Sequence, residues 1–295
     1  MLNSTELDRQ YNARAAVPDH SAYFARWRAD SVRTRKALTA EIDLAYASSS
    51  DEKLDFFHAE RRGKPLLVFI HGGYWRSLDK SDFSFLAPAF GAREVNLSVV
   101  NYGLAPGTSM EEMVRQLLRA VGWLYKNAAA MGFDPQRIVI AGHSAGAHLA
   151  AMMAAADWSN WDHLLPADVV HGIVCISGLY DLAPLARAPF LKDDIRLNRV
   201  GAAKLSPVNY RPRLAVPMVT AVGGDESAEF HRQNVLIRSC WPHCFRRDVP
   251  LPGCNHFSAV DALVDPDHLL FLNTLGLLGA NGGQDRVRVP GRLRI

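Results

Sequence analysis

The chain has 295 residues, of which 48% are hydrophobic, so it can bury one large core. Its 33 basic and 30 acidic side chains leave a formal net charge of +3. Residues 285–295 account for that charge alone, because they carry four arginines against Asp285. The rest of the chain is therefore close to neutral, which argues against a nucleic-acid-binding protein.

The cysteine content and the hydropathy of the chain indicate the cellular compartment in which the protein works. The 4 cysteines are too few for a disulfide scaffold. No apolar stretch approaches the roughly 20 residues of a membrane span, and no cationic start with an apolar run indicates export. We therefore expect a cytoplasmic protein that binds neither membranes nor nucleic acids and needs no cofactor. A homodimer stays open as an assembly.

One domain is expected over residues 1–280, followed by a flexible basic tail at 281–295. Residues 1–38 carry aromatic side chains among many charges, which indicates an amphipathic helical segment, interrupted near Pro18, that packs on the domain. Residues 180–210 are rich in proline, arginine and aspartate. They form either a small lid or an ordinary long connection between strands.

Short β-rich runs alternate with longer helical stretches, which predicts an α/β fold with a doubly wound, mainly parallel central sheet and helices on both faces. The expected strands are residues 41–46, 54–58, 66–70, 97–101, 137–141, 169–176, 218–222 and 244–249. The expected helices after the N-terminal segment are residues 83–91, 110–131, 145–156, 227–239 and 267–278. The run at 66–70 is apolar throughout, so we expect this strand to be buried on both faces.

One motif carries chemistry. Residues 142–146 read Gly-His-Ser-Ala-Gly, between an expected strand and an expected helix. This is the G-x-S-x-G pattern in the strand-turn-helix context that a nucleophile elbow requires. Its glycines leave room for a turn so sharp that the serine is held in a strained conformation. Ser144 is therefore the candidate nucleophile.

A serine hydroxyl is a weak nucleophile at neutral pH, so a base must take its proton and a carboxylate must orient that base. In a sheet of this kind the chain order is serine, acid, histidine. Asp225 follows one late expected strand and His256 follows the last one. We therefore expect a catalytic triad of Ser144, Asp225 and His256. Asp181, one strand earlier, is the alternative acid.

A second loop is expected to stabilise the negative charge that develops on the reacting carbonyl oxygen. Residues 71–75 read His-Gly-Gly-Tyr-Trp directly after the buried strand. The expected oxyanion donors are the backbone N–H group of Ala145 and that of Gly72 or Gly73. We expect His71 to brace this loop rather than to transfer protons.

A metal enzyme is an alternative, because Cys240, His243, Cys244, Cys254 and His256 lie fairly close in sequence. Their spacing does not match a structural zinc pattern, and a metal bound there would consume the expected base. We therefore expect no metal site.

These residues together resemble the arylformamidases, or kynurenine formamidases, of the α/β-hydrolase type, within the hormone-sensitive-lipase-like esterases. The resemblance covers most of the chain and rests on residues 11–14, 71–75, 101–102, 104–106, 142–149, 223–227 and 256–257. It implies an α/β-hydrolase fold and hydrolysis of N-formyl-L-kynurenine to L-kynurenine and formate, a step of tryptophan catabolism.

The resemblance also implies where specificity lies. A formyl group needs almost no acyl pocket, so selection is expected on the side of the large aromatic leaving group. The candidate substrate-binding residues there are Tyr74, Trp75, Tyr102 and the segment 180–210. Tyr74 and Trp75 would equally well cap the core. The expected partner is a small aromatic formamide, amide or ester.

Other functions stay open on the same residues. A carboxylesterase, a carbamate hydrolase or another aryl-amide hydrolase would use the same triad. A non-catalytic binding protein on this fold would normally have lost a triad residue or an oxyanion glycine, and none is lost.

Overall fold

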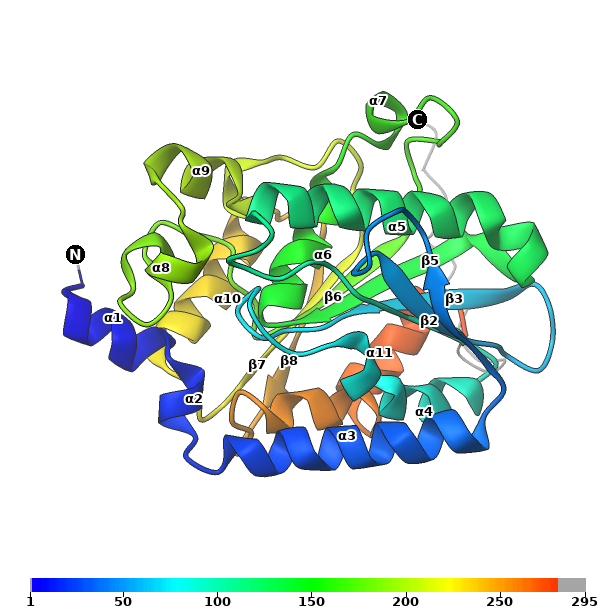
Figure 1. The fold of residues 1–295 in the computed structure, drawn as a ribbon, viewed down its shortest axis with the longest axis horizontal. Helices are drawn as coiled ribbons and strands as arrows, with labels where there is room; N and C mark the ends of the chain where they lie inside the picture. Colours follow the sequence, from blue (N-terminus) through cyan, green and yellow to red (C-terminus); the bar gives the residue numbers. More distant parts are fainter. Residues whose placement is uncertain (1, 281–295) are drawn as a thin grey trace, which may run out of the picture.

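The structure, a computed structural model, describes residues 2–280. The basic tail expected at 281–295 lies outside these residues. One eight-stranded sheet runs through the middle of the molecule, with helices on both of its faces (Figure 1). This architecture confirms the expected fold class.

All eight expected strands are present, although their ends differ by up to four residues. They are β1 (Ala40–Ala45), β2 (Lys53–Phe57), β3 (Lys64–Ile70), β4 (Asn96–Val100), β5 (Phe133–His143), β6 (Gly172–Ile176), β7 (Met218–Gly223) and β8 (Phe245–Leu251). Their order in the sheet is β1-β2-β4-β3-β5-β6-β7-β8. The β1–β2 and β2–β4 pairs are antiparallel, and every pair from β4 to β8 is parallel.

The α-helices are α1 (Ser4–Tyr11), α2 (Ala13–Ala16), α3 (His20–Ala37), α4 (Ala87–Gly91), α5 (Met110–Met131), α6 (Ala145–Ala155), α7 (Trp158–Trp161), α8 (Lys192–Ile195), α9 (Arg199–Lys204), α10 (Ala228–Cys240) and α11 (Leu269–Leu277). The short 3₁₀ turns are η1 (Lys80–Asp82), η2 (Ser84–Leu86), η3 (Leu185–Arg187), η4 (Pro207–Asn209) and η5 (Ser258–Leu263). The helix expected at 83–91 is instead a 3₁₀ turn followed by α4, which starts next to Pro88. Proline favours a helix start because it has no N–H group to donate. None of the helices within residues 2–280 is long and apolar enough to cross a membrane.

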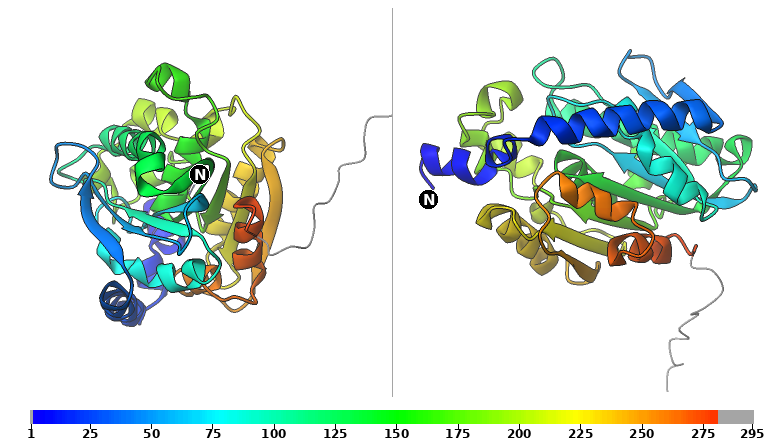
Figure 2. Two further views of the ribbon diagram at one scale, coloured as in Figure 1. Left: turned by 90° about the vertical axis from the view of Figure 1, so that its right-hand side faces the viewer. Right: turned by 90° about the horizontal axis from the view of Figure 1, so that it is seen from below.

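The helices form two layers. Helices α5, α6 and α10 cover one face of the sheet, and α4 and α11 cover the other (Figure 1). On this second side α3 runs along the outside of the molecule, packed against η1 and η2, as the two turned views also show (Figure 2).

Helix α5 illustrates how sequence signals set an element. The Ser109 side chain accepts a hydrogen bond from the Glu112 backbone N–H group at the N-terminus, and Gly132 ends the helix with a φ of 81°. Leu117 and Leu124 lie on its buried face. Capping, a first-turn acid and an apolar stripe all predict this helix, and its bounds match the expected 110–131.

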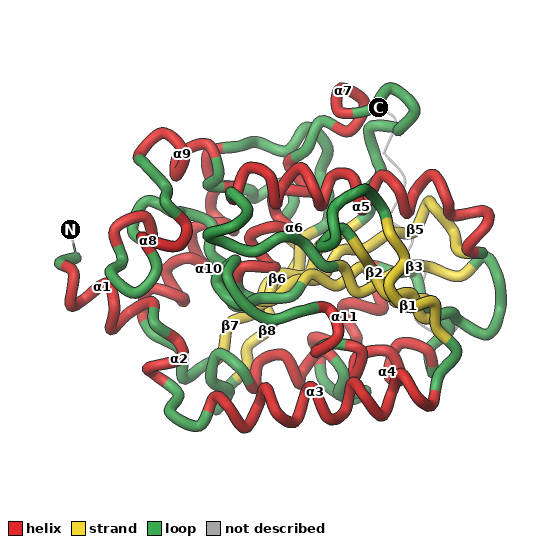
Figure 3. The backbone as a smooth tube through the Cα atoms, in the orientation of Figure 1, coloured by secondary structure: helices red, strands yellow, loops and turns green. Residues whose placement is uncertain are grey.

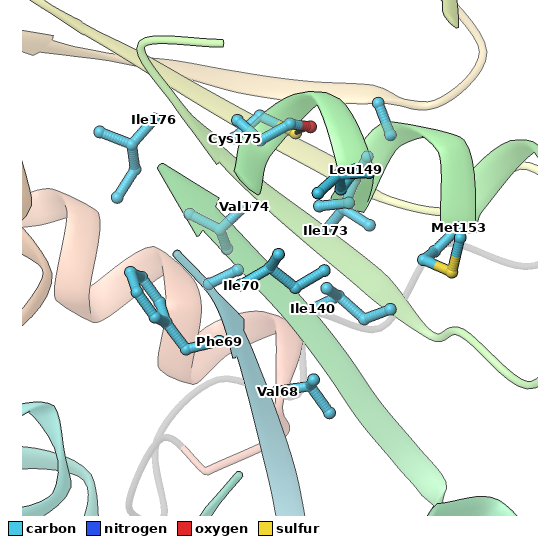
Figure 4. Close-up of a cluster of buried hydrophobic side chains, with 14 of the residues drawn as sticks. Val68, Phe69, Ile70, Ile140, Leu149, Met153, Ile173, Val174, Cys175 and Ile176 are labelled. Carbon is cyan, nitrogen blue, oxygen red and sulfur yellow. Dashed lines mark hydrogen bonds between the residues drawn. The ribbon is translucent and has the colours of Figure 1, made fainter. Parts of the chain in front are cut away.

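The hydrophobic core fills both faces of the sheet, and one part of it lies between α6 and the centre of the sheet. Residues 66–70 of β3 are fully buried, as their apolar run predicts. Figure 4 shows Leu149 and Met153 of α6 beside Ile140 of β5 and Ile173 of β6. Each such side chain stabilises the fold by roughly 1.5–3 kcal/mol when it is fully buried. This packing holds the end of β5 and the start of α6 in place.

The N-terminal segment is bound to the body of the molecule through α10. The Tyr11 side chain is completely buried, and its hydroxyl donates a hydrogen bond of 2.6 Å to Glu229 Oε2. The hydroxyl of Ser227 donates to the backbone oxygen of Gln10. Helices α1 and α10 lie side by side (Figure 3). Between α2 and α3 the chain bends at Pro18, as expected.

The segment 180–210 connects β6 to β7 and contains α8, α9 and two of the 3₁₀ turns (Figure 3). The Phe190 N–H group donates to Asp8 Oδ1 over 3.2 Å, and Arg76 donates to the Phe190 carbonyl oxygen over 2.7 Å. These contacts fix the segment to α1 and to the loop after β3. Its role as a lid stays a prediction.

Candidate active site

The nucleophile elbow has the geometry expected of it. Ser144 stands between β5 and α6 with φ 56° and ψ −118°, a backbone conformation that serine rarely adopts. A Cβ atom on Gly142 would lie 2.2 Å from the Gly146 carbonyl oxygen, and one on Gly146 would lie 1.9 Å from the Ile70 carbonyl oxygen. Both glycines are therefore required by the close approach of backbone to backbone. The Ser144 hydroxyl is buried and makes no hydrogen bond within the described chain.

His256 lies in the loop between β8 and η5, and its side chain is buried. The His143 ring packs against the His256 ring with centroids 4.7 Å apart, and Phe230 packs at the same distance. His143 Nε2 donates a hydrogen bond of 2.8 Å to the backbone carbonyl oxygen of His256. The residue next to Ser144 therefore holds the loop that carries the candidate base.

The carboxylate on His256 belongs to Glu226. His256 Nδ1 lies 2.6 Å from Glu226 Oε2, and the Glu226 carboxylate is also buried. The Gly223 N–H group donates to Glu226 Oε1 over 2.7 Å, and the Ser177 hydroxyl donates to the same oxygen. An ionised carboxylate can only accept, so Nδ1 carries the hydrogen and Nε2 keeps its lone pair. Nε2 is then the atom able to take a proton.

This geometry corrects the expected acid, Asp225. The Asp225 backbone N–H group donates to the Cys254 carbonyl oxygen over 3.0 Å, and the residue is exposed. The tight turn after β7 therefore directs Glu226 inward, toward His256, and leaves Asp225 on the outside. The alternative acid, Asp181, is also excluded, because its carboxylate accepts from the Ala183 N–H group and faces Arg232 at 3.5 Å.

The loop after β3 lies against the elbow. A Cβ atom on Gly72 would come 3.2 Å from Ser144 Cβ, so a side chain there would crowd the nucleophile. Gly73 has a φ of 105°, and a Cβ there would lie 2.1 Å from the Ser77 carbonyl oxygen. No hydrogen bond among residues 2–280 uses the N–H groups of Gly72, Gly73 or Ala145. These three groups are free for an oxyanion.

His71 braces that loop, as its sequence position suggests. The side chain is fully buried, with Nδ1 2.9 Å from the Gly72 carbonyl oxygen and Nε2 3.2 Å from Asn101 Oδ1. Burial lowers its pKa, so the ring is neutral at neutral pH. The Tyr102 hydroxyl donates to the His71 carbonyl oxygen over 2.9 Å.

The substrate-binding role expected for Tyr74, Trp75 and Tyr102 is also corrected, and the alternative role of capping the core holds for Tyr74 and Trp75. Tyr74, Trp75 and Tyr102 are all buried, and each uses its polar atom inside the protein. The Tyr74 hydroxyl donates to the Tyr11 carbonyl oxygen, and Trp75 Nε1 donates to His148 Nδ1 over 3.2 Å. These side chains cap the core and brace loops, because an aromatic polar group in a dry interior must find a partner there.

A cavity of about 260 Å³ opens instead beside His256 and Glu226. One side is formed by side chains from the end of α1 to the bend at Pro18, and the other by Asp225 and the first residues of α10. Neither Tyr74, Trp75 nor Tyr102 lines it. The sequence analysis missed two features. It did not identify Glu226 as the acid, because Glu226 is the direct neighbour of the expected acid. It also did not predict that the N-terminal segment forms one wall of this cavity, because no local sequence pattern indicates this.

The cysteine and histidine residues near the end of the chain do not converge. Cys175, Cys240, Cys244 and Cys254 are all free thiols. Within residues 2–280, no three histidine, cysteine or acidic side chains are placed to hold a metal ion.

The sequence of this chain was compared with family models and with known proteins. A family model described as BD-FAE matches residues 54–227. The kynurenine formamidase of Danio rerio is 28% identical over 295 residues, which cover 94% of this chain and 97% of that protein. Carboxylesterase NlhH of Mycobacterium tuberculosis is 40% identical over 96 residues, which are 32% of this chain and 30% of NlhH.

Among solved structures, a "putative thioesterase" from Silicibacter sp. TM1040 superposes with a TM-score of 0.80 and is 32% identical in sequence. The match covers 90% of this chain and 98% of that one.

Proposed function

Because the chain belongs to the BD-FAE family and is a hydrolase of the α/β-hydrolase fold, we propose that it is a serine hydrolase that removes the formyl group of N-formyl-L-kynurenine. The catalytic residues in this proposal are Ser144, His256 and Glu226. The observation that carries it is the 2.6 Å contact between Glu226 Oε2 and His256 Nδ1, because it leaves Nε2 free to act as the base. The choice of substrate is supported by the likeness to kynurenine formamidase along nearly the whole chain.

The first half of the reaction forms a formyl-enzyme. His256 Nε2 takes the proton of the Ser144 hydroxyl while Oγ attacks the formyl carbon. The carbonyl oxygen becomes an oxyanion beside the N–H groups of Ala145 and of Gly72 or Gly73, which stabilise it. Collapse breaks the C–N bond, and the arylamine leaves with the proton that His256 held.

The second half releases formate. A water molecule gives a proton to His256 Nε2 and attacks the formyl ester, and the same N–H groups receive the second oxyanion. Collapse returns the proton to Ser144 and frees formic acid, which ionises to formate. Throughout the cycle Glu226 keeps the hydrogen on Nδ1 and stabilises the imidazolium that forms twice.

The deciding experiment measures formate release from N-formyl-L-kynurenine by the purified protein, beside p-nitrophenyl acetate as an ester reference. The variant Ser144→Ala serves as the control and should lose all measurable turnover while keeping its fold. We expect kcat/KM for the formamide to exceed that for the ester. Fast ester cleavage without formamide turnover would discard the substrate and keep the mechanism. Activity retained by Ser144→Ala would discard the mechanism.

A carboxylesterase is the second candidate, and one observation favours it. The chain is 40% identical to carboxylesterase NlhH over 96 residues, whereas its identity to the kynurenine formamidase of Danio rerio is 28% over 295 residues. The same triad cleaves esters, so the formamide-to-ester ratio of kcat/KM separates the two candidates.

A further inference from the structure

The cavity beside His256 borders the candidate base of the reaction. When the tetrahedral intermediate collapses, the leaving group takes its proton from His256 Nε2, so it must lie within hydrogen-bond reach of this ring. The cavity is lined by His256 and by its partner Glu226, whereas the buried Ser144 is not among the lining residues. The formyl carbon carries only a hydrogen on its other side, so the acyl side needs no comparable space.

We propose that this cavity receives the leaving group, that the N-terminal segment sets its size, and that it selects compact aromatic leaving groups that are neutral or cationic. This inference rests on the proposed function, because it takes His256 as the general acid. It goes further by assigning substrate selection to residues 10–19, which lie far in sequence from every catalytic residue.

The N-terminal wall is held in place by hydrogen bonds at Tyr11 and Ala13. Tyr11 anchors it to Glu229 of α10, and the Tyr74 hydroxyl donates to the Tyr11 carbonyl oxygen. The Ala13 N–H group donates in turn to the Tyr74 hydroxyl over 3.4 Å. Tyr74 therefore couples the wall to the loop that carries the expected oxyanion donors, although it does not itself line the cavity.

The lining favours a small aromatic group. Ala13, Ala16, Val17 and Phe230 are among the lining residues of the cavity. The volume of about 260 Å³ lies just below the range of ligand pockets, which span about 300–1,000 Å³. One substituted benzene ring fits such a space.

The charges of the lining residues favour a neutral or cationic leaving group. Asp19 and Asp225 both border the cavity as exposed carboxylates, and no lysine or arginine is among its lining residues. An anionic leaving group would be repelled here, and an ammonium group would be attracted. Asp225 thus contributes to the site as a residue of the cavity lining rather than as the acid of the triad.

The first test measures binding of a leaving-group mimic, the phenyltrimethylammonium ion, by titration calorimetry. Ala16 is exposed toward the cavity, so Ala16→Trp should fill it and raise Kd at least tenfold. Ala15 is exposed on the same helix but does not line the cavity, so Ala15→Trp is the matched control and should leave Kd unchanged. Equal Kd in all three proteins, or no binding by the wild type, would overturn the proposal. Thermal unfolding of each variant verifies its fold.

The second test compares two acetate esters with leaving groups of equal shape, 4-tert-butylphenol and its cationic isostere 4-(trimethylammonio)phenol. Asp225→Asn should lower the cationic-to-neutral ratio of kcat/KM about threefold to tenfold, since one carboxylate charge is lost. An unchanged ratio would overturn the charge selection. Both tests are independent of formamide cleavage. Loss of the formamide activity alone would therefore refute the proposed substrate, and an unaltered Kd in Ala16→Trp would refute the cavity assignment.

Discussion

Glu226 and His256 form a buried pair in which the histidine Nδ1–H donates to the carboxylate over 2.6 Å. The Gly223 N–H group and the Ser177 hydroxyl hold the other carboxylate oxygen. The three donors come from the ends of β6 and β7 and from the loop after β8. The pair is therefore oriented by the sheet itself, and its chemistry can be tested by removing the charge alone.

Glu226→Gln should lower kcat by about 10³–10⁴-fold with a smaller effect on KM. The amide can donate to Nδ1, which would leave the hydrogen on Nε2 and prevent this atom from taking the Ser144 proton. Steady-state kinetics measure the effect. Asp181→Asn, whose carboxylate faces Arg232 rather than His256, is the matched control and should keep kcat near the wild-type value. If Asp225→Asn reproduced the loss seen in Glu226→Gln, the assignment of the acid would be wrong.

His143 is expected to act as a positioning residue for His256. Burial lowers its pKa well below the ordinary value, so it stays neutral and donates through Nε2 to the His256 carbonyl oxygen. His143→Leu removes this hydrogen bond and should lower kcat roughly tenfold while costing about 1 kcal/mol of stability. An unaltered kcat would show that the contact is structural only.

Gly146→Ala should destabilise the protein by about 3 kcal/mol or more, because its Cβ would lie 1.9 Å from the Ile70 carbonyl oxygen. Denaturant unfolding measures the change. Gly91 in α4 offers the control, since a Cβ there meets nothing within 4 Å. Gly91→Ala should change stability by no more than about 1 kcal/mol. Equal stability of the two variants would contradict the tight packing of the elbow.

Stability should fall as the pH drops from about 6.5 to about 4. Burial lowers the pKa of His148 to about 4, whereas an unfolded histidine titrates near pH 6.5. In this window the unfolded chain binds a proton that the folded one does not, so about 3 kcal/mol is lost on acidification and none above pH 6.5. His148→Gln should be less stable at neutral pH and depend less on pH in this window. Parallel curves for the two proteins would refute the assignment.

Tyr11→Phe should destabilise the protein by about 1–2 kcal/mol, because the hydroxyl that donates to Glu229 Oε2 is lost. The wall of the cavity would loosen with it, so KM for large leaving groups should rise more than KM for small ones. Chemical denaturation and kinetics with both substrate sizes measure these effects. Tyr125→Phe, at a partly exposed position of α5, is the control. Unchanged stability and KM would refute the anchoring role of Tyr11.

Local sequence determined a large part of this protein. The strands, the long helix α5 and the break at Pro18 follow from periodicity, capping and proline, which act over a few residues. The elbow at Ser144 and the glycines after β3 are equally local, because backbone crowding within one turn dictates them. His256 follows from its place after the last strand.

Only the tertiary structure decided which carboxylate meets His256. Asp225 and Glu226 are neighbours after β7, and chain order cannot separate them. The backbone hydrogen bond from the Asp225 N–H group to the Cys254 carbonyl oxygen fixes the turn that directs Glu226 inward. The positions of Tyr74 and of the N-terminal wall of the cavity likewise depend on contacts between residues more than 50 positions apart in the chain. Such contacts depend on how whole elements meet in space, and no pattern within one element encodes them.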